Sequence, residues 1–527
     1  MRSVMKHSFS EVPRANIQRS KFNRSHGYKT TFDADYLIPI FVDDVVPGDT
    51  FNLNMTFFAR LATPLYPIMD NMYLDSFWFF VPYRLVWDNW EKMHGAQDDP
   101  ADSIDFTVPQ CTESGAIGVG DIANYMGLPI GMQASVESFS ALPFRAYRLI
   151  WNEWFRDQNL QDSVTVVTDN GPDTNLESGY LSSPLKRGKR HDYFTSCLPW
   201  PQKGDAVDIP FSGTLDVQTD VAAGSAPEIW STSATDFRRL FAPSPVPTWV
   251  NVDTVGGAND ANKMYVDLAD ATSAVATIND LRLAFQTQRL LERDARSGTR
   301  YNELILSHFG VTVPDFRVQR PEFLGGGSSA VNINPVAQTS AQPTPAANDK
   351  LGNLAATGTV SGTHGFTKSF VEHGVIIGMV NVRSDLTYSQ GIERYWSKST
   401  RYDFYYPVLA QIGEQAVLNK ELYYSHATPD GVFGYQERYA EYRYKPSRLT
   451  GLMAVDAPSA LSAWHLSEDF TSDPALGDTF IQSNTATPLD RALAIPSEPQ
   501  FIFDSYINLQ CARPMPLFGV PGNLDHF

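Results

Sequence analysis

The sequence predicts a mainly β protein, either a sandwich or a jelly roll with elaborated loops. Short segments in which apolar and polar residues alternate recur along the chain, and this period of two indicates half-buried strands. Gly and Pro, 35 residues each among 527, supply many turns. Hydrophobic residues (43%) and aromatic residues (12%) suffice for a large core. Long connections between short strands are typical of a jelly roll.

The first predicted strands lie near the N-terminus. Apolar and polar residues alternate over 32–40 and again over 51–61, with turn residues at 47–49 between them. The stretch 72–87 is apolar on both faces in its middle, so we expect a strand that is covered on both sides.

Further strands are predicted in the C-terminal part of the chain. Residues 370–382 form a nearly continuous apolar run, which is typical of a buried strand. Aromatic residues dominate 402–409 and 434–444, and we interpret both segments as strands. Residues 501–515 predict a last strand that ends in a proline-broken tail.

A few helices are also expected. In residues 140–156, Ser140 can cap a helix, Pro143 lies in its first turn, and aromatic residues follow on one stripe. Residues 278–297 carry a second apolar stripe and end before Gly298, and a shorter helix is expected over 300–309.

Two segments are interpreted as insertions into one domain that spans 31–527. Residues 205–270 carry ten acids against three bases, a net charge of −7, so we expect an exposed insertion with some strand of its own. Residues 325–365 have almost no large apolar side chains and predict a long extended surface loop. The glycines at 325–327 are interpreted as a flexible joint, because no helix follows them to form a phosphate site.

Charge is distributed unevenly along the chain. The net charge is −18, so most of the surface should repel nucleic acid. Residues 1–30 are the exception, with seven bases against one acid, and we interpret them as a basic N-terminal arm without a core of its own. A tail that only increases solubility is the alternative for this segment.

The cysteines and the N-terminus indicate a protein made in a reducing compartment. Cys111, Cys197 and Cys511 are odd in number and far apart, so neither a disulfide framework nor a zinc ribbon is expected. The first residues hold no apolar signal segment, and no apolar stretch approaches the 18 residues of a membrane span, so membrane insertion is not expected.

The sequence predicts no catalytic residue, no metal ligand and no cofactor. Histidines are scattered, with His364 and His373 isolated in a strand region, and the HExxH, GxSxG and P-loop patterns do not occur. Acidic residues over 169–177 surround Gly171-Pro172, but their spacing misses the EF-hand loop, so an ordinary acidic turn is favoured over a cation site.

A second basic cluster surrounds Gly188, where four cations and His191 fall within six positions. We expect a phosphate-binding turn, with Tyr193 and Phe194 available to stack on bases. A solvated turn or a salt-bridge patch between subunits is the alternative. The candidate DNA-contacting residues from both basic segments are Arg14, Arg19, Lys21, Arg24, Lys186, Arg187, Lys189 and Arg190.

Five stretches, in the same order along the chain, resemble the major capsid protein of gokushoviruses, small tailless phages of the microvirus family. They are RSHGYKTTFDADYLIPIFVDDVVPGDTF, LDSFWFFVPYRLVWDNWEKMHG, KRGKRHDYFTSCLPWPQKG, RPEFLGGGSS and FGYQERYAEYRYKPSRLTG. The resemblance extends over nearly the whole chain, and the acidic stretch 205–270 and the loop 325–365 lie outside it.

The resemblance implies an eight-stranded antiparallel jelly roll with large loop insertions and a few helices. It also implies self-assembly into a T=1 icosahedral shell around a circular single-stranded DNA genome, in company with minor virion proteins. Such phages carry protrusions at the threefold axes, to which attachment to a host surface receptor is attributed. Composition places this protrusion on 205–270. The shell is then expected to assemble in the bacterial cytoplasm.

A secreted carbohydrate-binding or carbohydrate-active β-sandwich protein is the alternative function. Aromatic richness and a jelly-roll pattern favour it, because lectins share both. The lack of a signal peptide and of a placed pair of carboxylates argues against it.

Overall fold

The structure is a computed structural model, and its residues fall into two compact units. One unit comprises Met1–Pro201 and Thr312–Phe527, and the other comprises Gln202–Val311. The described residues are 17–112, 115–174, 179–207, 278–312, 318–340 and 351–519, together with five short strands between 217 and 266.

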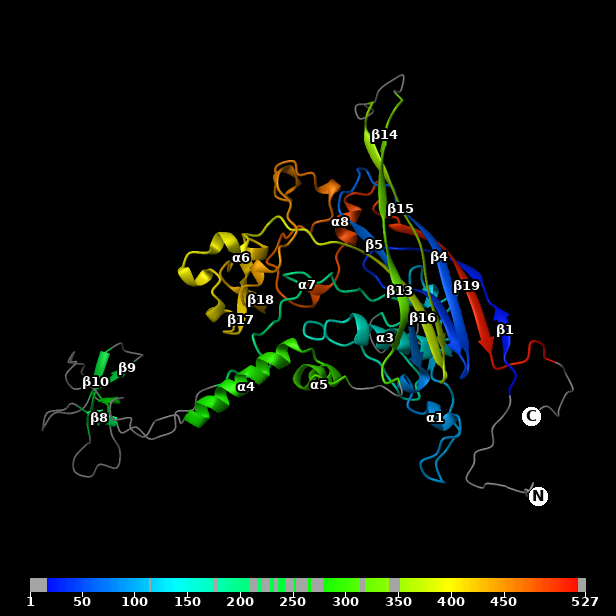
Figure 1. Cartoon of the computed structure of the whole chain (residues 1–527), viewed down its shortest axis with the longest axis horizontal. Coiled ribbons are helices and arrows are strands. Elements are labelled where there is room, and N and C mark those ends of the chain that lie inside the picture. Colours follow the sequence, from blue (N-terminus) through cyan, green and yellow to red (C-terminus); the bar gives the residue numbers. More distant parts are fainter. Residues whose placement is uncertain are drawn as a thin grey trace. The chain divides into compact units, whose positions relative to one another are not determined.

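The larger unit is built on two antiparallel sheets (Figure 1). The first sheet contains β1 (Ser20–Asn23), β2 (His26–Phe32), β19 (Phe501–Arg513), β4 (Thr50–Leu61), β15 (Leu354–Ser369) and β14 (Asn332–Ala337). The second contains β13 (Glu322–Ala330), β5 (Met72–Pro82), β16 (Gly374–Ser384) and β3 (Ile38–Val45).

The strand order identifies a jelly roll. Eight strands follow one another along the chain as β2, β3, β4, β5, β13, β15, β16 and β19. Within the first sheet the order is β2-β19-β4-β15, and within the second it is β3-β16-β5-β13. If the eight strands are lettered B to I, the sheets are B-I-D-G and C-H-E-F, which is the order of an eight-stranded jelly roll. The predicted fold is therefore confirmed.

Alternating burial shows how the sequence specifies this sandwich. In β4 and β19, residues alternate between buried and exposed along almost the whole strand, so each presents one face to the core. By contrast, nine of the eleven residues of β5 and ten of the eleven in β16 are buried. The face of β5 and β16 that points away from the first sheet packs against α3 (Leu142–Ile150). Phe144, Tyr147 and Ile150 of α3 belong to the same hydrophobic cluster as the side chains on that face. A sheet covered on both faces explains the continuous apolar runs in these two strands.

Two long connections carry most of the remaining elements (Figure 1). Between β5 and β13 lie η1 (Tyr83–Leu85), α1 (Trp90–Met93), β6 (Gln110–Cys111), α2 (Ile122–Tyr125), β7 (Phe139–Ser140), α3, the π turn η2 (Trp151–Phe155) and the smaller unit. Between β16 and β19 lie η5 (Arg394–Ser397), η6 (Arg401–Asp403), η7 (Pro407–Leu409), β17 (Glu414–Leu418), α6 (Asn419–Leu422), β18 (Val432–Glu437), η8 (Ala440–Tyr442), η9 (Gly451–Met453), η10 (Ser462–Trp464), α7 (Asp478–Ile481) and α8 (Ala486–Asp490).

The smaller unit contains two helices and five short strands among its described residues. The helices are α4 (Ile278–Arg296) and α5 (Tyr301–Phe309), as predicted for 278–297 and 300–309. The strands are β8 (Val217–Thr219), β9 (Glu228–Ser231), β10 (Asp236–Phe241), β11 (Asn251–Val252) and β12 (Met264–Val266). Most of the predicted protrusion 205–270 lies outside the described residues.

The prediction of an extended loop over 325–365 is wrong for much of this segment, which forms strands instead. Its glycines belong to β13, and residues 332–337 and 354–365 form β14 and β15. An added Cβ at Gly326 would lie 2.2 Å from the carbonyl oxygen of Ser76, and one at Gly327 would lie 2.4 Å from the ring of His364. Glycine is required here because a side chain would collide with neighbouring backbone and rings, so the glycines mark close packing rather than a flexible joint.

His364 connects the two sheets. It lies on β15, and its Nδ1 is 2.7 Å from Ser76 Oγ on β5 while its Nε2 is 3.2 Å from Ser329 Oγ on β13. Burial lowers the pKa of His364, because an apolar environment disfavours the charged ring.

Other predicted boundaries also shift. Residues 402–409 are not a strand: 3₁₀ turns η6 and η7 occupy most of the segment. The predicted helix 140–156 is α3 followed by η2, and its N-cap is Ala141 rather than Ser140. The predicted strand 434–444 ends at Glu437, where β18 ends and a turn follows.

The N-terminal strand region is also divided differently. Residues 20–23 and 26–30, placed in the basic arm by their composition, pair with β19 instead. Backbone hydrogen bonds to a neighbouring strand do not depend on side-chain charge, which is why composition missed these edge strands. The predicted strand 32–40 is interrupted at Asp35, whose φ of 75° turns the chain between β2 and β3.

Cys111, Cys197 and Cys511 are buried free thiols. Among the described residues, no helix combines the length and the apolar character that a bilayer crossing demands.

Candidate functional site

The candidate residues of the N-terminal segment lie at an edge of the first sheet. Arg14 falls outside the described residues. Arg19 and Lys21 are exposed, and Arg19 Nη2 donates to Thr50 Oγ1 at 2.7 Å. Arg24 forms a two-pronged ion pair with Asp43, in which Nη2 donates to Oδ1 at 2.9 Å. Arg19 and Lys21 therefore remain the most accessible cations of this group that the structure describes.

The segment 186–190 is an extended strand-like link rather than the predicted tight turn. The backbone N–H of Arg187 donates to the carbonyl oxygen of Asp35 at 2.9 Å, and that of Lys189 donates to Ile481 at 2.8 Å. The carbonyl oxygen of Arg187 accepts a bond from Ser483 N–H at 2.9 Å. These bonds hold the segment between two distant parts of the chain and fix where its side chains lie.

Two of the four cations in this link form ion pairs inside the protein: Arg187, which is partly buried, and Lys189, which is buried. Arg187 Nη1 donates to Asp75 Oδ2 at 2.6 Å, and its guanidinium lies 4.6 Å from the centre of the Phe77 ring. Lys189 Nζ lies 2.8 Å from Glu468 Oε1. A buried cation needs such a partner, because burial alone strongly disfavours its charge.

The other two cations are more accessible. Lys186 is half-buried, with Nζ 5.4 Å from the centre of the Tyr36 ring. Arg190 Nη1 lies 3.3 Å from Asp385 Oδ1, and its guanidinium lies 4.3 Å from the centre of the Tyr73 ring.

The neighbouring aromatic residues do not fulfil the predicted role. Tyr193 and Phe194 are 6% and 4% exposed and belong to a small core cluster. Tyr193 Oη donates to Glu421 Oε2 at 3.0 Å. The fold therefore gives no support for stacking of these two rings on bases, because both side chains are almost fully buried.

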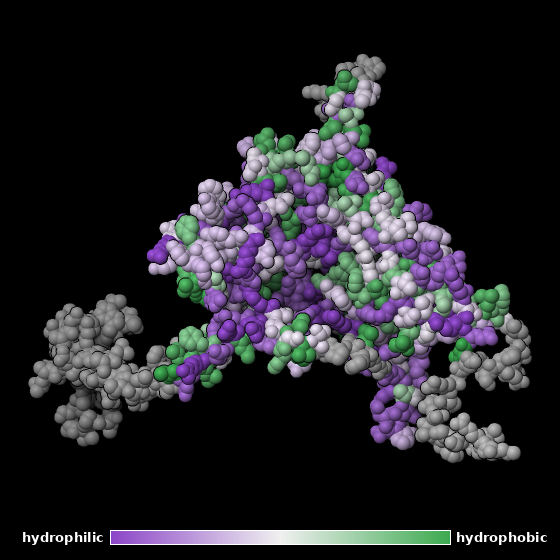
Figure 2. All heavy atoms as spheres, in the orientation of Figure 1, coloured by the Kyte–Doolittle hydropathy of each residue, from purple (hydrophilic) through white to green (hydrophobic). Residues whose placement is uncertain are grey.

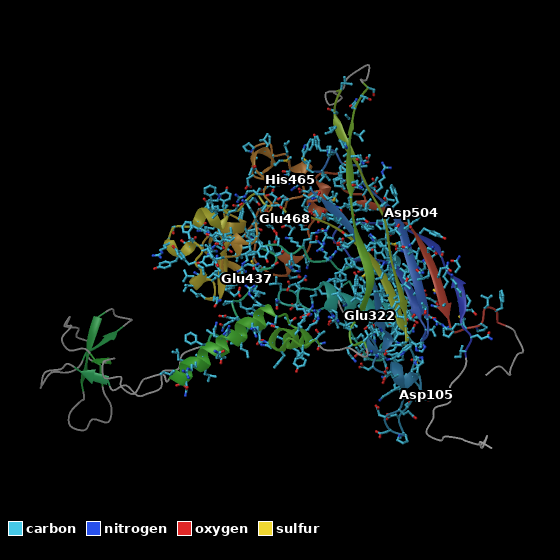
Figure 3. All side chains as sticks on the ribbon, viewed as in Figure 1. Asp105, Glu322, Glu437, His465, Glu468 and Asp504 are labelled. Atoms are coloured by element: carbon cyan, nitrogen blue, oxygen red, sulfur yellow. The ribbon has the colours of Figure 1, made fainter. Side chains whose placement is uncertain are left out.

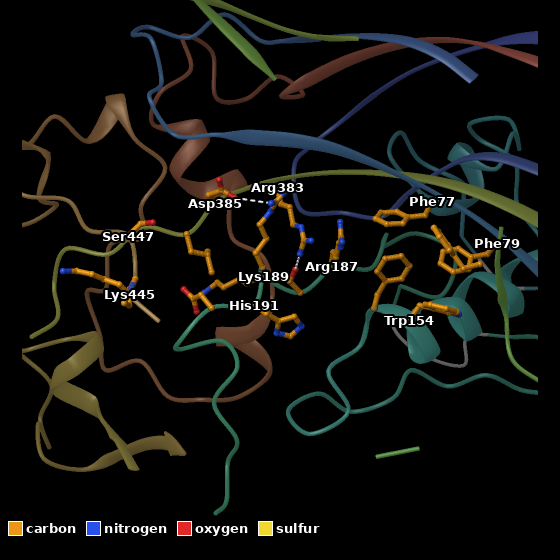
Figure 4. Close-up of a pocket in the computed structure, with 17 residues that line it drawn as sticks. Phe77, Phe79, Trp154, Arg187, Lys189, His191, Arg383, Asp385, Lys445 and Ser447 are labelled. Atoms are coloured by element: carbon orange, nitrogen blue, oxygen red, sulfur yellow. Dashed lines mark hydrogen bonds and ion pairs between the residues drawn. The ribbon is translucent and has the colours of Figure 1, made fainter. Parts of the chain in front are cut away.

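Instead, Arg187, Lys189 and Arg190 line a cleft of about 760 Å³ (Figure 4). A hollow is visible in the middle of the face drawn in Figure 2, bordered by hydrophilic residues. Aromatic side chains lie at one end of the cleft and basic ones in its middle (Figure 4). The aromatic lining residues are Phe77, Phe79, Trp154, Phe155 and Phe323, and the charged ones are Arg187, Lys189, Arg190, Asp192, Arg383, Asp385 and Lys445.

Two of the aromatic rings face solvent at this end. Trp154 is 39% exposed and Phe323 is 43% exposed, with ring centres 6.0 Å apart. The guanidinium of Arg320 lies 5.0 Å from the centre of the Trp154 ring. Exposed flat rings beside cations are the features on which single-stranded nucleic acids stack.

Positive charge is in excess inside the cleft. Burial and the neighbouring charge of Arg187 lower the pKa of Arg383 to about 9, and burial also lowers the pKa of Arg187. The Nε atoms of Arg190 and Arg383 have no hydrogen-bond partner among the described residues. Both Nε atoms are buried, and Arg383 Nε lies 3.7 Å from Asp75 Oδ2, so an anion in the cleft would stabilise the charges of these arginines without binding those atoms.

Sequence reasoning found half of this site. It selected Arg187, Lys189 and Arg190 because they are adjacent in the chain, but it missed Arg383, Lys445 and the aromatic end. Arg383 is paired with Tyr73 across β16 and β5, so only the sheet register brings it to the cleft. No local pattern could have indicated that contact.

The predicted acidic turn around Gly171-Pro172 forms an ion pair inside the protein. Asp173 binds Arg145, whose Nε donates to Oδ2 at 2.9 Å, and both side chains are almost fully buried. Residues 175–178 lie outside the described part. Among the described residues, no group of three or more His, Cys, Asp or Glu side chains is arranged to hold a metal ion.

Comparisons with known proteins give one consistent result. Residues 10–523 match the family model described as "Capsid protein (F protein)". The chain is 45% identical to capsid protein VP1 of Bdellovibrio phage phiMH2K and 44% identical to that of Chlamydia phage 1, over 99% of this chain and 98% of each relative. It is 35% identical to capsid protein VP1 of Spiroplasma virus 4, over 98% of this chain and 97% of the relative.

The chain belongs to this family of phage capsid proteins. It is thus a structural protein of a phage virion, and it assembles with copies of itself into the capsid. The predicted resemblance to gokushovirus capsid proteins is confirmed. The alternative of a secreted carbohydrate-binding or carbohydrate-active protein finds no support in these comparisons.

Proposed function

We propose that this capsid protein forms a small T=1 icosahedral shell that encloses a circular single-stranded DNA genome, and that the cleft between β5, η2 and β16 holds part of that genome. The cleft is the observation that carries the proposal. It combines exposed rings for base stacking with an excess of basic side chains, in a chain whose net charge of −18 otherwise repels DNA.

Within the cleft the roles follow from accessibility. Arg187 and Lys189 are neutralised by Asp75 and Glu468, so they support the site rather than contact phosphate. Arg383 also lies beside Asp75, at 3.7 Å, and its side chain is only 14% exposed, so it too supports the site. Arg190, whose side chain is 31% exposed, is the phosphate-contacting residue, and Trp154 is the stacking platform. Such contacts carry no sequence preference and weaken with salt, as packaging of a whole genome requires.

Electron microscopy of the purified protein tests the shell. Round particles of one diameter, with a mass of sixty subunits, are expected for T=1 symmetry. A monomer or an open sheet at every concentration would contradict the proposal.

The DNA content of particles tests the cleft. Arg190→Gln with Trp154→Leu should lower the ratio of encapsidated single-stranded DNA to protein while particles still form. Lys420→Gln is the matched control, because Lys420 forms an ion pair with Asp430 away from the cleft. If the double variant packages as much DNA as the control, the cleft does not hold the genome.

The N-terminal basic segment is a second proposed DNA contact, through Arg14, Arg19, Lys21 and Arg24. Removal of residues 1–16 leaves β1 intact and should reduce DNA content more than particle number. Substitution of Arg19 and Lys21 by Gln extends the test to β1, and normal packaging by both variants would refute the role of this segment.

The smaller unit is proposed to carry the host-attachment protrusion at the threefold axes, through residues 205–270. Its identification as a separate compact unit and the net charge of −7 over 205–270 support this assignment. Minor virion proteins and a host surface receptor complete the proposed partners, and assembly is proposed to take place in the bacterial cytoplasm. Particles whose smaller unit is exchanged for that of a relative should change their host adsorption.

A further inference from the structure

We propose that an aromatic, positively charged surface on the connection between β16 and β19 binds the acidic loop that follows α1 in a second copy of the chain. The aromatic surface comprises residues 394–406 and 434–448, and the acidic loop comprises residues 96–105. The inference rests on the assembly of copies into the proposed shell and assigns two of the surfaces that meet there.

The aromatic surface is unusually apolar for a surface in contact with water. Tyr395, Trp396 and Tyr402 are 64%, 70% and 68% exposed. Neighbouring rings are also close together, because the ring centres of Tyr395 and Trp396 lie 5.2 Å apart and those of Tyr405 and Tyr442 lie 6.1 Å apart. Contiguous exposed aromatic residues mark protein–protein contacts, whereas single exposed ones are common.

The surface is also hollowed. Tyr395, Trp396, Tyr442 and Arg448 help to line a groove of about 390 Å³, which can receive side chains of a partner. Aromatic and arginine side chains around such a groove are the residue types that contribute most to binding at protein interfaces.

The two surfaces are electrically complementary. The aromatic surface contains seven bases and three acids, a net charge of +4, and the acidic loop contains four Asp residues and no base, a net charge of −4. Asp102 Oδ2 accepts the backbone N–H groups of Asp98 and Asp99 at 3.2 Å each, which fixes the turn of the loop. Ile104, 48% exposed, adds an apolar contact to the loop.

A protein loop fits the aromatic surface better than nucleic acid does. Glu441 lies 3.4 Å from Lys398, and Glu437 pairs with Arg443, so acids are interspersed among the bases and would repel phosphate. An acidic loop that also carries an apolar residue matches the exposed rings and the net positive charge together.

The location of the two surfaces requires a second copy. Asp105 and Glu437 lie far apart on the same unit (Figure 3), so one chain cannot bring its own two surfaces together. A contact between two different surfaces of identical chains is heterologous, and repeated around a symmetry axis it closes a ring, as a capsid demands.

Charge reversal in the full-length protein tests this contact by particle yield in sedimentation and electron microscopy. Arg401→Glu with Arg448→Glu, and separately Asp98→Lys with Asp105→Lys, should each lower the yield of particles at least tenfold. All four substitutions in one chain restore opposite charges and should return the yield to within about threefold of wild type. Asp430→Lys, which reverses an exposed acid outside both surfaces, is the control and should assemble normally.

Three results would overturn the assignment. The first is normal assembly by either reversed pair, and the second is failure of the fourfold variant to recover while its circular dichroism matches wild type. The third is normal particle yield with reduced DNA in Arg401→Glu/Arg448→Glu, which would assign the surface to nucleic acid. If wild-type protein forms no particles under the same conditions, the proposed shell fails instead, so the two failures are distinguishable.

Discussion

Replacement of Asp173 by Asn tests whether one buried ion pair holds the long connection between β5 and β13 on the sandwich. The side chains of Arg145 and Asp173 are 0% and 1% exposed. Arg145 Nη1 also donates to the carbonyl oxygen of Val86 at 3.0 Å. Tyr180 Oη donates to Asp173 Oδ2 at 2.8 Å. The pair therefore ties α3 to three other segments of the connection.

The size of the effect follows from what remains after the change. The amide introduced by Asp173→Asn has nearly the shape of the carboxylate but no charge, so it leaves the guanidinium of Arg145 buried beside a single carboxylate, that of Asp169. The carboxylate of Asp169 lies 3.4 Å from Arg145 Nη2 and is 73% exposed, so water screens it. Removing one partner of a buried pair costs about 3–5 kcal/mol, whereas removing an exposed partner costs about 0–1 kcal/mol.

Urea unfolding of unassembled subunits, followed by tryptophan fluorescence, measures the difference. Trp87 reports on this region because its Nε1 donates to Asn170 Oδ1 at 2.8 Å. Asp173→Asn should lower the free energy of unfolding by at least about 2 kcal/mol more than Asp169→Asn, its matched control. Arg145→Met with Asp173→Leu should recover part of the loss, because no charge is then buried. Equal midpoints for the two single variants, or no recovery in the double variant, would refute the uncompensated charge as the cause.

Two further predictions concern the packing between the sheets. Gly326→Ala should lower the free energy of unfolding, measured in urea, by about 1–3 kcal/mol, because the added Cβ would lie 2.2 Å from the backbone oxygen of Ser76. Gly115→Ala is the control: an added Cβ there has no atom within 4 Å, so the free energy of unfolding should change by less than about 0.5 kcal/mol. The pKa of His364 is lower in the folded than in the unfolded chain, so as the pH falls the unfolded chain takes up this proton at a higher pH. The contribution of His364 to stability is therefore complete above about pH 6.5 and is lost as the pH falls below that value. His364→Gln should flatten the decline in urea midpoint between pH 7 and 5, and His191→Gln, at an exposed position, should leave that decline unchanged if the reasoning holds.

The sequence predicted strands correctly where one physical condition was met: either one face of the strand is buried and the other exposed to solvent, or both faces are buried. β4 and β19 alternate because one face meets the core, and β16 is continuously apolar because α3 covers its second face. Side-chain hydrophobicity then records the environment directly.

The errors arose where that condition failed. β13 carries three consecutive glycines, so its strand is set by close backbone packing that hydrophobicity does not record. Residues 402–409 are rich in aromatic side chains, and aromatic content was taken as a sign of a strand. These rings lie on the surface instead, within η6 or between η6 and η7. Aromatic residues that serve an interface look the same in a sequence as those that serve a core.

The same limit applies to the candidate site. The basic link was visible because its cations are consecutive, but the partners that neutralise two of them lie far along the chain. Asp75 is 112 positions from Arg187, and Glu468 is 279 positions from Lys189. Burial of a cation is decided by such contacts, so its availability for phosphate could not be judged before the fold was known.

The jelly roll can carry its functional surfaces on long insertions at a small cost in folding free energy. β5 and β13 are neighbouring antiparallel strands that a two-residue hairpin could join, yet residues 83–321 connect them. Loop closure costs about 0.6 kcal/mol for each doubling of length, so some seven doublings cost about 4 kcal/mol. Burial of Phe144, Tyr147 and Ile150 of α3 on the second sheet contributes about 1.5–3 kcal/mol for each side chain, which exceeds that cost. The connection is therefore anchored by its own packing, and the segments before and after α3, including the acidic loop, can vary without loosening the sandwich.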